Sequence, residues 1–323
     1  MKNLLSLSLL LLLFSCNSSV DWEERRGDWE PFRSHHIQYK QVDYLNSPYA
    51  RHLVDHQGEQ ALDFMKSLDL FSIAFENDGL LITGFLIQPK GAKNTPVIVF
   101  HRGGNRDLGL LKVMTMMDPL AEFALKGYSV VAINYRGNSA SQGADEFGGK
   151  DVNDLSYLLQ SLNSLPGLDA TRVALLGISR GGMMCYQLMK QRPNVKAVAI
   201  IGGLSNLLTN REFHPEMKEV FEELIPGYAE RPEEVLKERS VFYWTEALPE
   251  IPLLLFHGRQ DVHIDVNDSR ALVKKLQARN YPIQYYEYDD NHGVTAHREE
   301  VMELIMQHFD KHLDMPPSTA QIH

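Results

Sequence analysis

A series of short, strongly apolar segments recurs along the chain, and each is followed by a segment with the residue pattern of a helix. Segments this apolar are typical of strands buried on both faces, and their alternation with helices predicts a mainly parallel, doubly wound α/β sheet. Strands are predicted within 95–104, 128–137, 172–179, 195–203, 252–261 and 282–290. Helices are predicted within 116–127, 150–167, 180–193, 266–280 and 297–313.

Two segments depart from this alternation. Residues 71–91 hold two apolar runs joined by "ENDG", a strong hairpin signal that predicts antiparallel strands at one edge of the sheet. Residues 207–248 have a helical composition but lie between two predicted strands. We interpret them as a small helical insertion over the carboxyl edge of the sheet, where ligands bind in open α/β folds.

The N-terminus has a different character. The stretch "MKNLLSLSLLLLLFSC" begins with a lysine, continues with a leucine-rich run and ends in small residues and Cys16. This pattern is typical of a secretory signal, and the run is too short for a comfortable transmembrane helix. Its end, "LFSC", resembles a bacterial lipobox, in which the cysteine becomes the lipidated first residue of the mature protein. We therefore expect an exported lipoprotein anchored to a bacterial membrane, periplasmic or at the cell surface; the alternative is an ordinary secretory signal that abuts a cysteine.

Composition narrows the function classes. Of the 323 residues 44% are hydrophobic, which is enough for a sizeable core. The net charge is −10 and there is no block of five or more basic residues, so nucleic-acid binding is not expected. The second cysteine, Cys185, lies in an apolar stretch and is predicted to be a buried small hydrophobe. The chain has no metal-ligand spacing, phosphate loop or dinucleotide fingerprint, so we expect no metal and no cofactor.

Ser179 stands in "GISRG", residues 177–181, between a predicted strand and the helix that follows it. A G-x-S-x-G pattern at such a turn places the serine in strained backbone, and the small residues two positions away let neighbouring chains pass closely. The helix directs its N-terminus at the serine and favours negative charge there. The pattern alone also occurs by chance in tight turns; its place in a doubly wound sheet predicts that Ser179 is a nucleophile.

A serine hydroxyl is a poor nucleophile near neutral pH and needs a base that is itself oriented by an acid. In this architecture the acid and then the histidine follow the nucleophile along the chain. Asp261 ends the strand in "LLLFHGRQD" and His292 follows the last strand in "YYEYDDNHG", so both are predicted at the carboxyl edge with Ser179. Two other histidines are near: His297 is assigned to the last helix, and His257 to a packed or hydrogen-bonded position.

Other carboxylates near these turns have structural interpretations. Asp265 and Asp268 follow the same strand as the predicted acid but lie at or inside the next helix, where Asp268 is placed as a helix-start residue. Asp289 and Asp290 are expected to cap or orient the loop that carries the predicted base. Asp151 is expected to cap the helix that follows it.

An oxyanion hole needs two backbone donors that point at the developing negative charge. One is predicted to be the amide of Arg180, next to the nucleophile. The other is predicted to come from the loop "HRGGN", residues 101–105, where the amide of Arg102 is the candidate and the alternative is a glycine turn with no catalytic role. The two arginine side chains either meet an acidic group of the substrate or pair with carboxylates such as Asp107 and Glu146.

Several of these motifs, in this order, resemble the catalytic domain of the prolyl oligopeptidase family of serine peptidases, which has the α/β-hydrolase fold. The matching pieces are "HRGG", "NYRGN" followed by "GGKDVNDL", "GISRGG", "FHGRQD" and "NHG". The resemblance covers roughly residues 70–312. It implies a Ser179–Asp261–His292 catalytic triad and hydrolysis through an acyl-enzyme.

The chain also departs from that family pattern. About fifty residues lie between Cys16 and the first predicted strands, too few for the β-propeller that those peptidases usually carry. "HRGG" replaces "HGGP", and His101 stands where some members place an oxyanion tyrosine. The family's relatives without a propeller include carboxylesterases and carbohydrate esterases. An esterase is therefore favoured over a peptidase.

The sequence thus predicts a serine hydrolase for a small-molecule ester or a short peptide; the alternative is an inactive surface binding module on the same fold. Residues 1–16 are interpreted as a lipoprotein signal peptide, 17–69 as a tether and N-terminal extension that is helical in part, and 70–315 as the catalytic domain. The insertion at about 207–248 is expected to line the substrate pocket. Its aromatic run, residues 242–244, supplies candidate walls, Phe242, Tyr243 and Trp244; the alternative is ordinary packing of these residues on the core.

Overall fold

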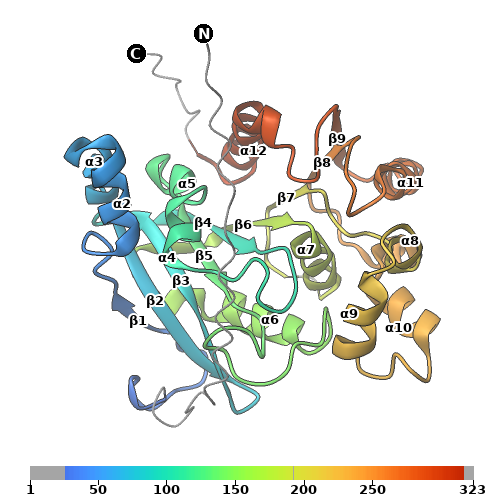
Figure 1. The fold of residues 1–323 in the computed structure, drawn as a ribbon, viewed down its shortest axis with the longest axis horizontal. Helices are drawn as coiled ribbons and strands as arrows, with labels where there is room; N and C mark the ends of the chain where they lie inside the picture. Colours follow the sequence, from blue (N-terminus) through green and yellow to red (C-terminus); the bar gives the residue numbers. More distant parts are fainter. Residues whose placement is uncertain (1–25, 192, 316–323) are drawn as a thin grey trace.

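The computed structural model describes residues 26–191 and 193–315 (Figure 1). Cys16 and the predicted signal peptide lie outside the described residues. A nine-stranded sheet with the strand order β1-β2-β3-β5-β4-β6-β7-β8-β9 forms the centre of the molecule. Its strands are β1 (Gln38–Gln41), β2 (Leu68–Asn77), β3 (Leu80–Pro89), β4 (Thr95–His101), β5 (Ser129–Ile133), β6 (Leu168–Ile178), β7 (Ala197–Ile201), β8 (Leu253–Gly258) and β9 (Ile283–Tyr288).

The sheet is antiparallel at one edge and parallel elsewhere. β1, β2, β3 and β5 pair antiparallel in that order. β4 pairs parallel with both β5 and β6, and β6 to β9 continue the parallel part. The hairpin between β2 and β3 turns at Asp78 and Gly79, both with positive φ, which is the backbone that "ENDG" favours. The mostly parallel, doubly wound sheet with an N-terminal hairpin confirms the predicted fold class.

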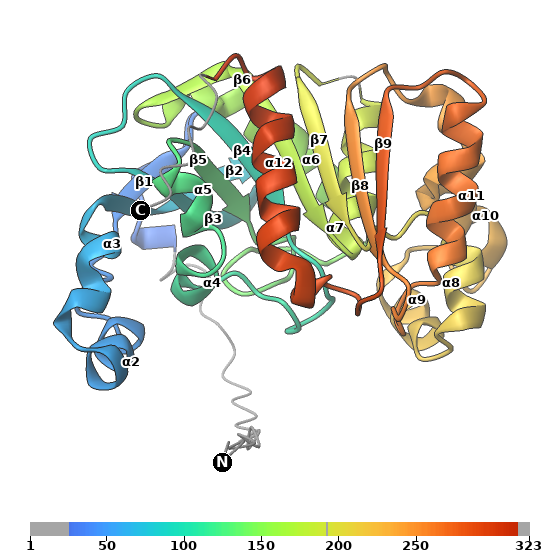
Figure 2. The same ribbon diagram turned by 90° about the horizontal axis from the view of Figure 1, so that it is seen from above.

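The helices lie on both faces of the sheet. They are α2 (Pro48–Gln57), α3 (Asp63–Lys66), α4 (Val113–Met117), α5 (Ala121–Leu125), α6 (Asp151–Ser161), α7 (Arg180–Lys190), α8 (Leu207–Phe213), α9 (Met217–Leu224), α10 (Pro232–Arg239), α11 (Val266–Gln277) and α12 (Arg298–His312). Figure 2 shows α12 crossing in front of the sheet, with α6 and α7 behind it. Residues of α6, α7 and α11 share one core, and residues of α4, α5 and α12 share the other.

The two cores follow from the period of two along each strand. In β6, Val173 and Leu175 belong to the core under α6 and α7, whereas Ala174 and Leu176 belong to the core under α12. A strand covered on both faces must be apolar at every position, which is why these strands appear in the sequence as continuous apolar runs.

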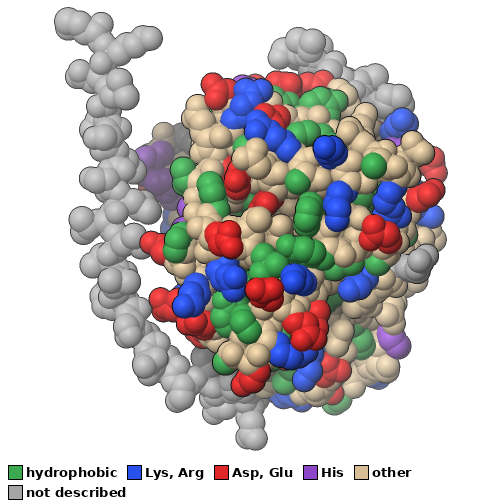
Figure 3. All heavy atoms as spheres, turned by 90° about the vertical axis from the view of Figure 1, so that its right-hand side faces the viewer, with side chains coloured by type: hydrophobic (Ala, Val, Ile, Leu, Met, Phe, Trp, Pro, Cys, Tyr) green, Lys and Arg blue, Asp and Glu red, His purple; other side chains and the backbone are tan. Residues whose placement is uncertain are grey.

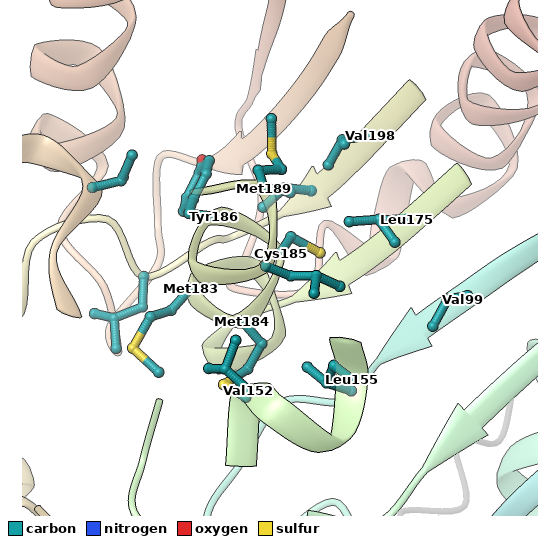
Figure 4. Packing of buried hydrophobic residues seen from close by; sticks show 14 of the residues in the cluster. Val99, Val152, Leu155, Leu175, Met183, Met184, Cys185, Tyr186, Met189 and Val198 are labelled. Atoms are coloured by element: carbon teal, nitrogen blue, oxygen red, sulfur yellow. The ribbon is translucent and has the colours of Figure 1, made fainter. Parts of the chain in front are cut away.

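The helix after Ser179 is anchored deep in one core. Figure 4 shows Met183, Met184, Cys185 and Met189 of α7 packed among residues of α6, β4, β6 and β7. All four side chains are fully buried. Cys185 is a free, buried thiol whose pKa is raised by burial, as expected for a small hydrophobe. Because α7 cannot shift without disturbing this core, its N-terminus is a rigid support.

The segment predicted as an insertion forms α8, α9 and α10 between β7 and β8. Figure 1 shows these helices gathered on the side of the molecule that also carries α11. Figure 3 looks onto that side, where acidic and basic side chains are interspersed with apolar ones. No helix among the described residues is both long and apolar enough to pass through a membrane.

Local features differ from the expectations. β1 lies within the segment interpreted as a tether and extension, and it pairs with β2, so the sheet begins before residue 70. Ile37, just before β1, is fully buried in one core. The helix predicted within 116–127 is instead two short helices, α4 and α5, separated around Pro119, because proline cannot continue a helix.

Candidate active site

Ser179 lies at the turn between β6 and α7. Its backbone has φ 58° and ψ −122°, a conformation that is strained for a residue with a side chain. The amide of Ser179 donates to the carbonyl oxygen of Ile201 at 2.9 Å, and its carbonyl oxygen accepts from the amide of Leu204 at 3.1 Å. The segment around the end of β7 therefore holds the strained turn in place.

Glycines flank Ser179 because the backbone passes too close for side chains. A Cβ on Gly181 would lie 1.9 Å from the carbonyl oxygen of His101, and a Cβ on Gly177 would lie 2.5 Å from the carbonyl oxygen of Gly181. His101 ends β4 and is paired with Gly177 in the register between β4 and β6. The turn is thus pressed against the start of the loop that follows β4.

His292 and Asp261 are in direct contact. The Nδ1 atom of His292 lies 2.6 Å from Oδ2 of Asp261. An ionised carboxylate can only accept, so Nδ1 carries a hydrogen, which leaves Nε2 of a neutral His292 able to take up a proton. The side chain of Asp261 is fully buried, whereas 21% of the His292 side chain is exposed. The pair combines a shielded carboxylate with an accessible imidazole.

Four donors surround the Asp261 carboxylate. Oδ2 is contacted by His292 and by Nε2 of His257 at 3.0 Å, and Oδ1 accepts from the amides of His263 at 2.8 Å and Ile264 at 3.0 Å. Burial alone would raise the pKa of Asp261, but the hydrogen bonds from His257 and His292 outweigh it and hold that pKa well below its usual value. Asp261 is therefore ionised at any pH near neutrality.

Two further carboxylates after β8 serve the structure. Asp265 is the N-cap of α11 and accepts from the amide of Asn267 at 2.9 Å. Asp268 lies in the first turn of α11, as expected for a helix-start residue, and it is buried with both of its oxygens 2.7 Å from Oγ1 of Thr209 in α8. Burial raises the pKa of Asp268 to about 6. This residue ties the insertion to α11.

Asp290 organises the loop that carries His292. It accepts from the amides of Asn291 at 2.7 Å and Ala296 at 2.8 Å, and from the ring of His297 at 2.9 Å. The expectation that a carboxylate here orients the loop therefore holds for Asp290. His297 lies in a short turn, η5 (Thr295–His297), directly before α12 rather than inside it.

The loop after β4 brings Gly103 beside Ser179. A Cβ on Gly103 would lie 3.0 Å from Cβ and 3.6 Å from Oγ of Ser179. Arg102 is buried, and its Nη1 atom donates to the carbonyl oxygens of Gly103 and Leu108, both at 2.9 Å, while Nη2 donates to Asn138. The side chain of Arg102 thus braces the loop, and Gly103 is the residue at the serine.

Arg180 is buried directly after Ser179. Its guanidinium binds Asp145 at 2.5 and 2.7 Å and Asp151 at 2.9 Å, and it lies between the rings of Tyr135 and Phe147 at 4.5 and 4.4 Å from their centroids. Of the two roles left open for this side chain, pairing with protein carboxylates is the one observed. Asp151 is accordingly an ion partner of Arg180, not the cap of α6, whose N-cap position is occupied by the preceding residue.

Ser179 and His292 line one cavity of about 810 Å³. Most of its lining comes from the loop after β4, the residues on either side of Ser179, the segment after Asp261 and the insertion. The other lining residues are Gly103, Gly104, Asn105, Arg106, Leu108, Gly109, Phe147, Ile178, Arg180, Leu204, Asn210, His214, Glu216, Met217, Glu219, Val220, His263 and Ile264. Among the described residues no hydrogen bond joins the Ser179 hydroxyl to His292. Such hydrogen bonds are often long in unliganded enzymes and shorten when substrate binds.

Helices α8 and α9 of the insertion form one wall of this cavity, whereas the aromatic run at residues 242–244 does not. Asn210, Met217 and Val220 face the cavity, but none of residues 242–244 does. Phe242, Tyr243 and Trp244 follow α10 in turns that pack against α7 and α11, and lysine ammonium groups lie over the rings of Phe242 and Trp244. Of the two interpretations of these three residues, the structure supports packing on the core over a role as cavity walls, because aromatic character alone does not say which neighbour a turn packs against.

Several apolar residues of the cavity lining are not predicted from the sequence. Phe147 stands in an irregular loop where no periodicity marks a buried side chain. Met217 and Val220 are spaced as one face of a helix, a signal that could have identified them. Within residues 26–191 and 193–315, no group of three or more His, Cys, Asp or Glu side chains is placed to hold a metal ion.

Comparison with known proteins places the chain. The model of the prolyl oligopeptidase family matches residues 116–316, more than half of the 323 residues, and the match includes Ser179, Asp261 and His292. The chain belongs to the prolyl oligopeptidase family. It is a serine hydrolase with the α/β-hydrolase fold, which confirms the predicted enzyme class and the resemblance on which that prediction partly rested.

Curated relatives of this family member are named as peptidases. It is 25% identical over 220 residues to the uncharacterized peptidase YtmA of Bacillus subtilis (strain 168), covering 68% of this chain and 84% of that protein. It is 23% identical over 241 residues to the acylamino-acid-releasing enzyme of Sus scrofa, covering 65% of this chain but 30% of that protein. The chain thus spans most of the first relative and about a third of the second.

Solved structures share the fold. The acylaminoacyl peptidase of Pyrococcus horikoshii superposes with a TM-score of 0.68 and 24% identity, over 80% of this chain and 44% of that chain. The Pyrococcus furiosus esterase Pf2001 superposes with a TM-score of 0.61 and 18% identity, over 76% and 92%. Acetyl xylan esterase 1 from Thermoanaerobacterium sp. superposes with a TM-score of 0.59 and 18% identity, over 90% and 92%. These likenesses establish the fold.

Proposed function

We propose that Ser179, His292 and Asp261 form the catalytic triad of this hydrolase. Ser179 Oγ attacks the carbonyl carbon of an ester or amide, and His292 Nε2 takes the hydroxyl proton and then gives it to the leaving group. Water attacks the resulting acyl-enzyme in the second half of the reaction, with His292 again acting as the base. The observation that carries the proposal is the 2.6 Å contact of His292 with buried Asp261, beside the cavity that His292 shares with the strained Ser179.

The oxyanion hole of the proposed mechanism uses two backbone amides. Arg180 is the first residue of α7, so its amide hydrogen has no partner within the helix and is available to a developing negative charge. For the second donor the structure supports Gly103 over Arg102. Gly103 lies against the Ser179 side chain and lines the cavity, whereas Arg102 is not among the residues that line it.

The cavity favours a substrate with an apolar side chain. Its lining includes Phe147, Leu204, Met217 and Val220, while carboxylates such as Glu216 stand at exposed positions of the lining. The names of relatives support a peptide substrate, the less favoured of the two predicted substrate classes. The structural similarity to two esterases, each covered by this chain over 92% of its length, supports a small ester. Both substrate classes require the same acyl-enzyme chemistry.

The decisive experiment compares the wild type with Ser179→Ala. We expect the wild type to react covalently with a fluorophosphonate probe and the variant to lose labelling and turnover. Its melting temperature should fall little, because alanine fits the space of the serine side chain. An unlabelled wild type would instead support an inactive binding module.

A substrate panel separates peptide from ester. Aminoacyl p-nitroanilides and p-nitrophenyl esters of matched acyl groups are compared by kcat/KM, since that ratio measures discrimination between competing substrates. We expect turnover of anilides with an apolar acyl side chain as well as of esters. Hydrolysis of esters alone would assign the protein as an esterase. If the fluorophosphonate labels the protein but neither substrate class is turned over, the protein must accept an acyl group that the panel does not contain.

We also propose that the protein is exported and anchored to the membrane through a lipidated Cys16. The support is the sequence pattern of the first sixteen residues. Arg26, where the described chain begins, is bound to Glu76 of β2 at 2.8 Å and to the carbonyl oxygen of Gly79 at 2.7 Å. An anchor would therefore join the fold at the hairpin, at the opposite end of the strand order from β9.

A further inference from the structure

His257 is a buried imidazole that the proposed mechanism does not use. It lies near the end of β8 and is fully buried. Its Nε2 atom is 3.0 Å from Oδ2 of Asp261 and 3.1 Å from the carbonyl oxygen of Ile264, and its Nδ1 atom is 2.7 Å from Oγ of Ser269. Both neighbours of Nε2 can only accept, so Nε2 carries a hydrogen whatever the charge of the ring.

Two imidazoles therefore share one carboxylate oxygen. Oδ2 of Asp261 receives Nε2–H of His257 from one side and Nδ1–H of His292 from the other, at 3.0 and 2.6 Å. Oδ1 is held by the amides of His263 and Ile264. Each donor fixes one direction at the carboxylate, and without His257 the oxygen that orients His292 would be held by His292 alone.

The charged groups around His257 are few. Asp261 contacts it directly, and His292 lies beyond Asp261. From α11, the carboxylate of Asp268 is close enough for the charges of the two groups to interact. From β9, Glu287 is the register partner of His257, and its carboxylate is already bound by Arg259 and Arg270 at 2.9 and 2.7 Å.

We propose that His257 is a positioning residue for the reaction: its Nε2–H fixes Oδ2 of Asp261 and thereby the orientation and charge of the carboxylate that supports His292. This inference rests on the proposed triad. His257 touches neither substrate nor the reacting atoms, so it acts through Asp261. It also withdraws part of the carboxylate's charge, which sets how strongly the protonated form of His292 is held.

The test uses two substitutions that differ in one donor. His257→Gln can place its amide nitrogen near the position of Nε2 and keep the hydrogen bond to Asp261, whereas His257→Leu fills similar volume without a donor. For His257→Leu we expect kcat to fall about tenfold with little change in KM, because a charge-assisted hydrogen bond is lost from the machinery and not from the substrate site. The acid limb of the pH profile of kcat/KM should move to higher pH, because the carboxylate's charge is then more available to protonated His292. His257→Gln should restore most of both.

Ser269→Ala is the matched control, because it removes the hydrogen bond on the other side of the same ring. We expect it to lower the melting temperature without moving the acid limb. The inference is overturned if His257→Leu keeps the wild-type rate and pH profile, if His257→Gln is impaired as much as His257→Leu, or if Ser269→Ala moves the acid limb equally.

Fluorophosphonate labelling separates this inference from the proposed triad. Loss of labelling in Ser179→Ala tests the nucleophile, and the rate of labelling in His257→Leu tests the positioning. A wild type that is labelled at Ser179, with His257→Leu labelled at the same rate, would reject the role of His257 and leave the triad standing. A wild type that is not labelled would reject the triad itself.

Discussion

Arg180 couples a buried side chain to the backbone group beside the nucleophile. Its guanidinium is enclosed by Asp145, Asp151 and two aromatic rings, so the first turn of α7 is fixed directly beside Ser179. Burial raises the pKa of Asp151, and the charge of Arg180 counteracts that effect. The cluster of Arg180, Asp145 and Asp151 therefore stabilises the fold most when it is complete, since removal of one member leaves an uncompensated buried charge.

We predict that Arg180→Met lowers the free energy of unfolding by about 3 kcal/mol, because two buried carboxylates lose their partner. Chemical denaturation at pH 7 measures the change. Arg231→Met is the control: Arg231 forms an exposed pair with Glu234 at 2.7 Å, for which a loss of at most about 1 kcal/mol is expected. Equal losses in the two variants would show that the buried cluster contributes no more than a surface pair.

At the level of residues, the sequence placed Ser179, Asp261 and His292 at one edge of the sheet because each follows the carboxyl end of a strand, and strand ends are marked by apolar runs. It did not indicate that Gly103 contacts the Ser179 side chain, because which residue of a glycine loop lies at the serine depends on contacts such as that of Arg102 with Leu108. Nor could it show that His257 contacts Asp261, since that pairing follows from the conformation of the turn between them.

Elements were predictable where burial dictates the residue pattern. The strands covered on both faces are apolar at every position, and the hairpin is marked by its turn. β1 was missed because "QYKQ" is polar and mostly exposed: an edge strand with little to bury has no alternation to detect. The division of one predicted helix into α4 and α5 was missed because a proline is tolerated near a helix start, and the sequence did not show where the helix begins.

Asp268 makes the attachment of α8 to α11 depend on pH. Its folded-state pKa of about 6 lies above the usual value of a carboxyl group, so the folded state holds the proton more tightly than the unfolded state. The stabilisation is fully present below about pH 4 and is lost as the pH rises through about 6. We predict that Asp268→Asn, which keeps an acceptor for Thr209, becomes more stable relative to wild type as the pH rises from 4.5 to 7.5.

Melting temperatures of both proteins across that pH range measure the effect. The difference in the free energy of unfolding between the two proteins should change by about 1 to 3 kcal/mol between the extremes of pH. Asp265→Asn serves as the control, because Asp265 is the N-cap of the same helix and accepts from the amide of Asn267 instead of binding Thr209. A constant difference between Asp268→Asn and wild type at all pH values would contradict the prediction.

At the scale of the molecule, the strands that the N-terminal segment contacts and the strands that precede the predicted triad lie in different halves of the sheet. Residues from Arg26 onward contact the β2–β3 hairpin, whereas the predicted triad follows β6, β8 and β9. Attachment of the chain at its N-terminus therefore need not obstruct the cavity.

We predict that Cys16→Ser abolishes incorporation of an alkyne-tagged fatty acid and moves the protein from the membrane fraction to the aqueous phase in detergent partitioning. Cys185→Ser is the matched control, since the other cysteine is fully buried in the core and should leave labelling unchanged. Retention of the label in Cys16→Ser would rule out lipidation at this residue.

The wall built by α8 and α9 is attached to the rest of the molecule by buried apolar residues of one core, among them Leu207, Val220 and Phe221, and by a few polar contacts. Arg106 binds Glu223 at 2.8 Å, Asn210 donates to the carbonyl oxygen of His263 at 2.8 Å, and Thr209 binds Asp268. None of these contacts uses the side chains of the predicted triad. Positions of this segment that line the cavity, such as Met217, can therefore vary with the reacting groups left in place, so that selection for a new substrate can act on one segment while the chemistry is inherited unchanged.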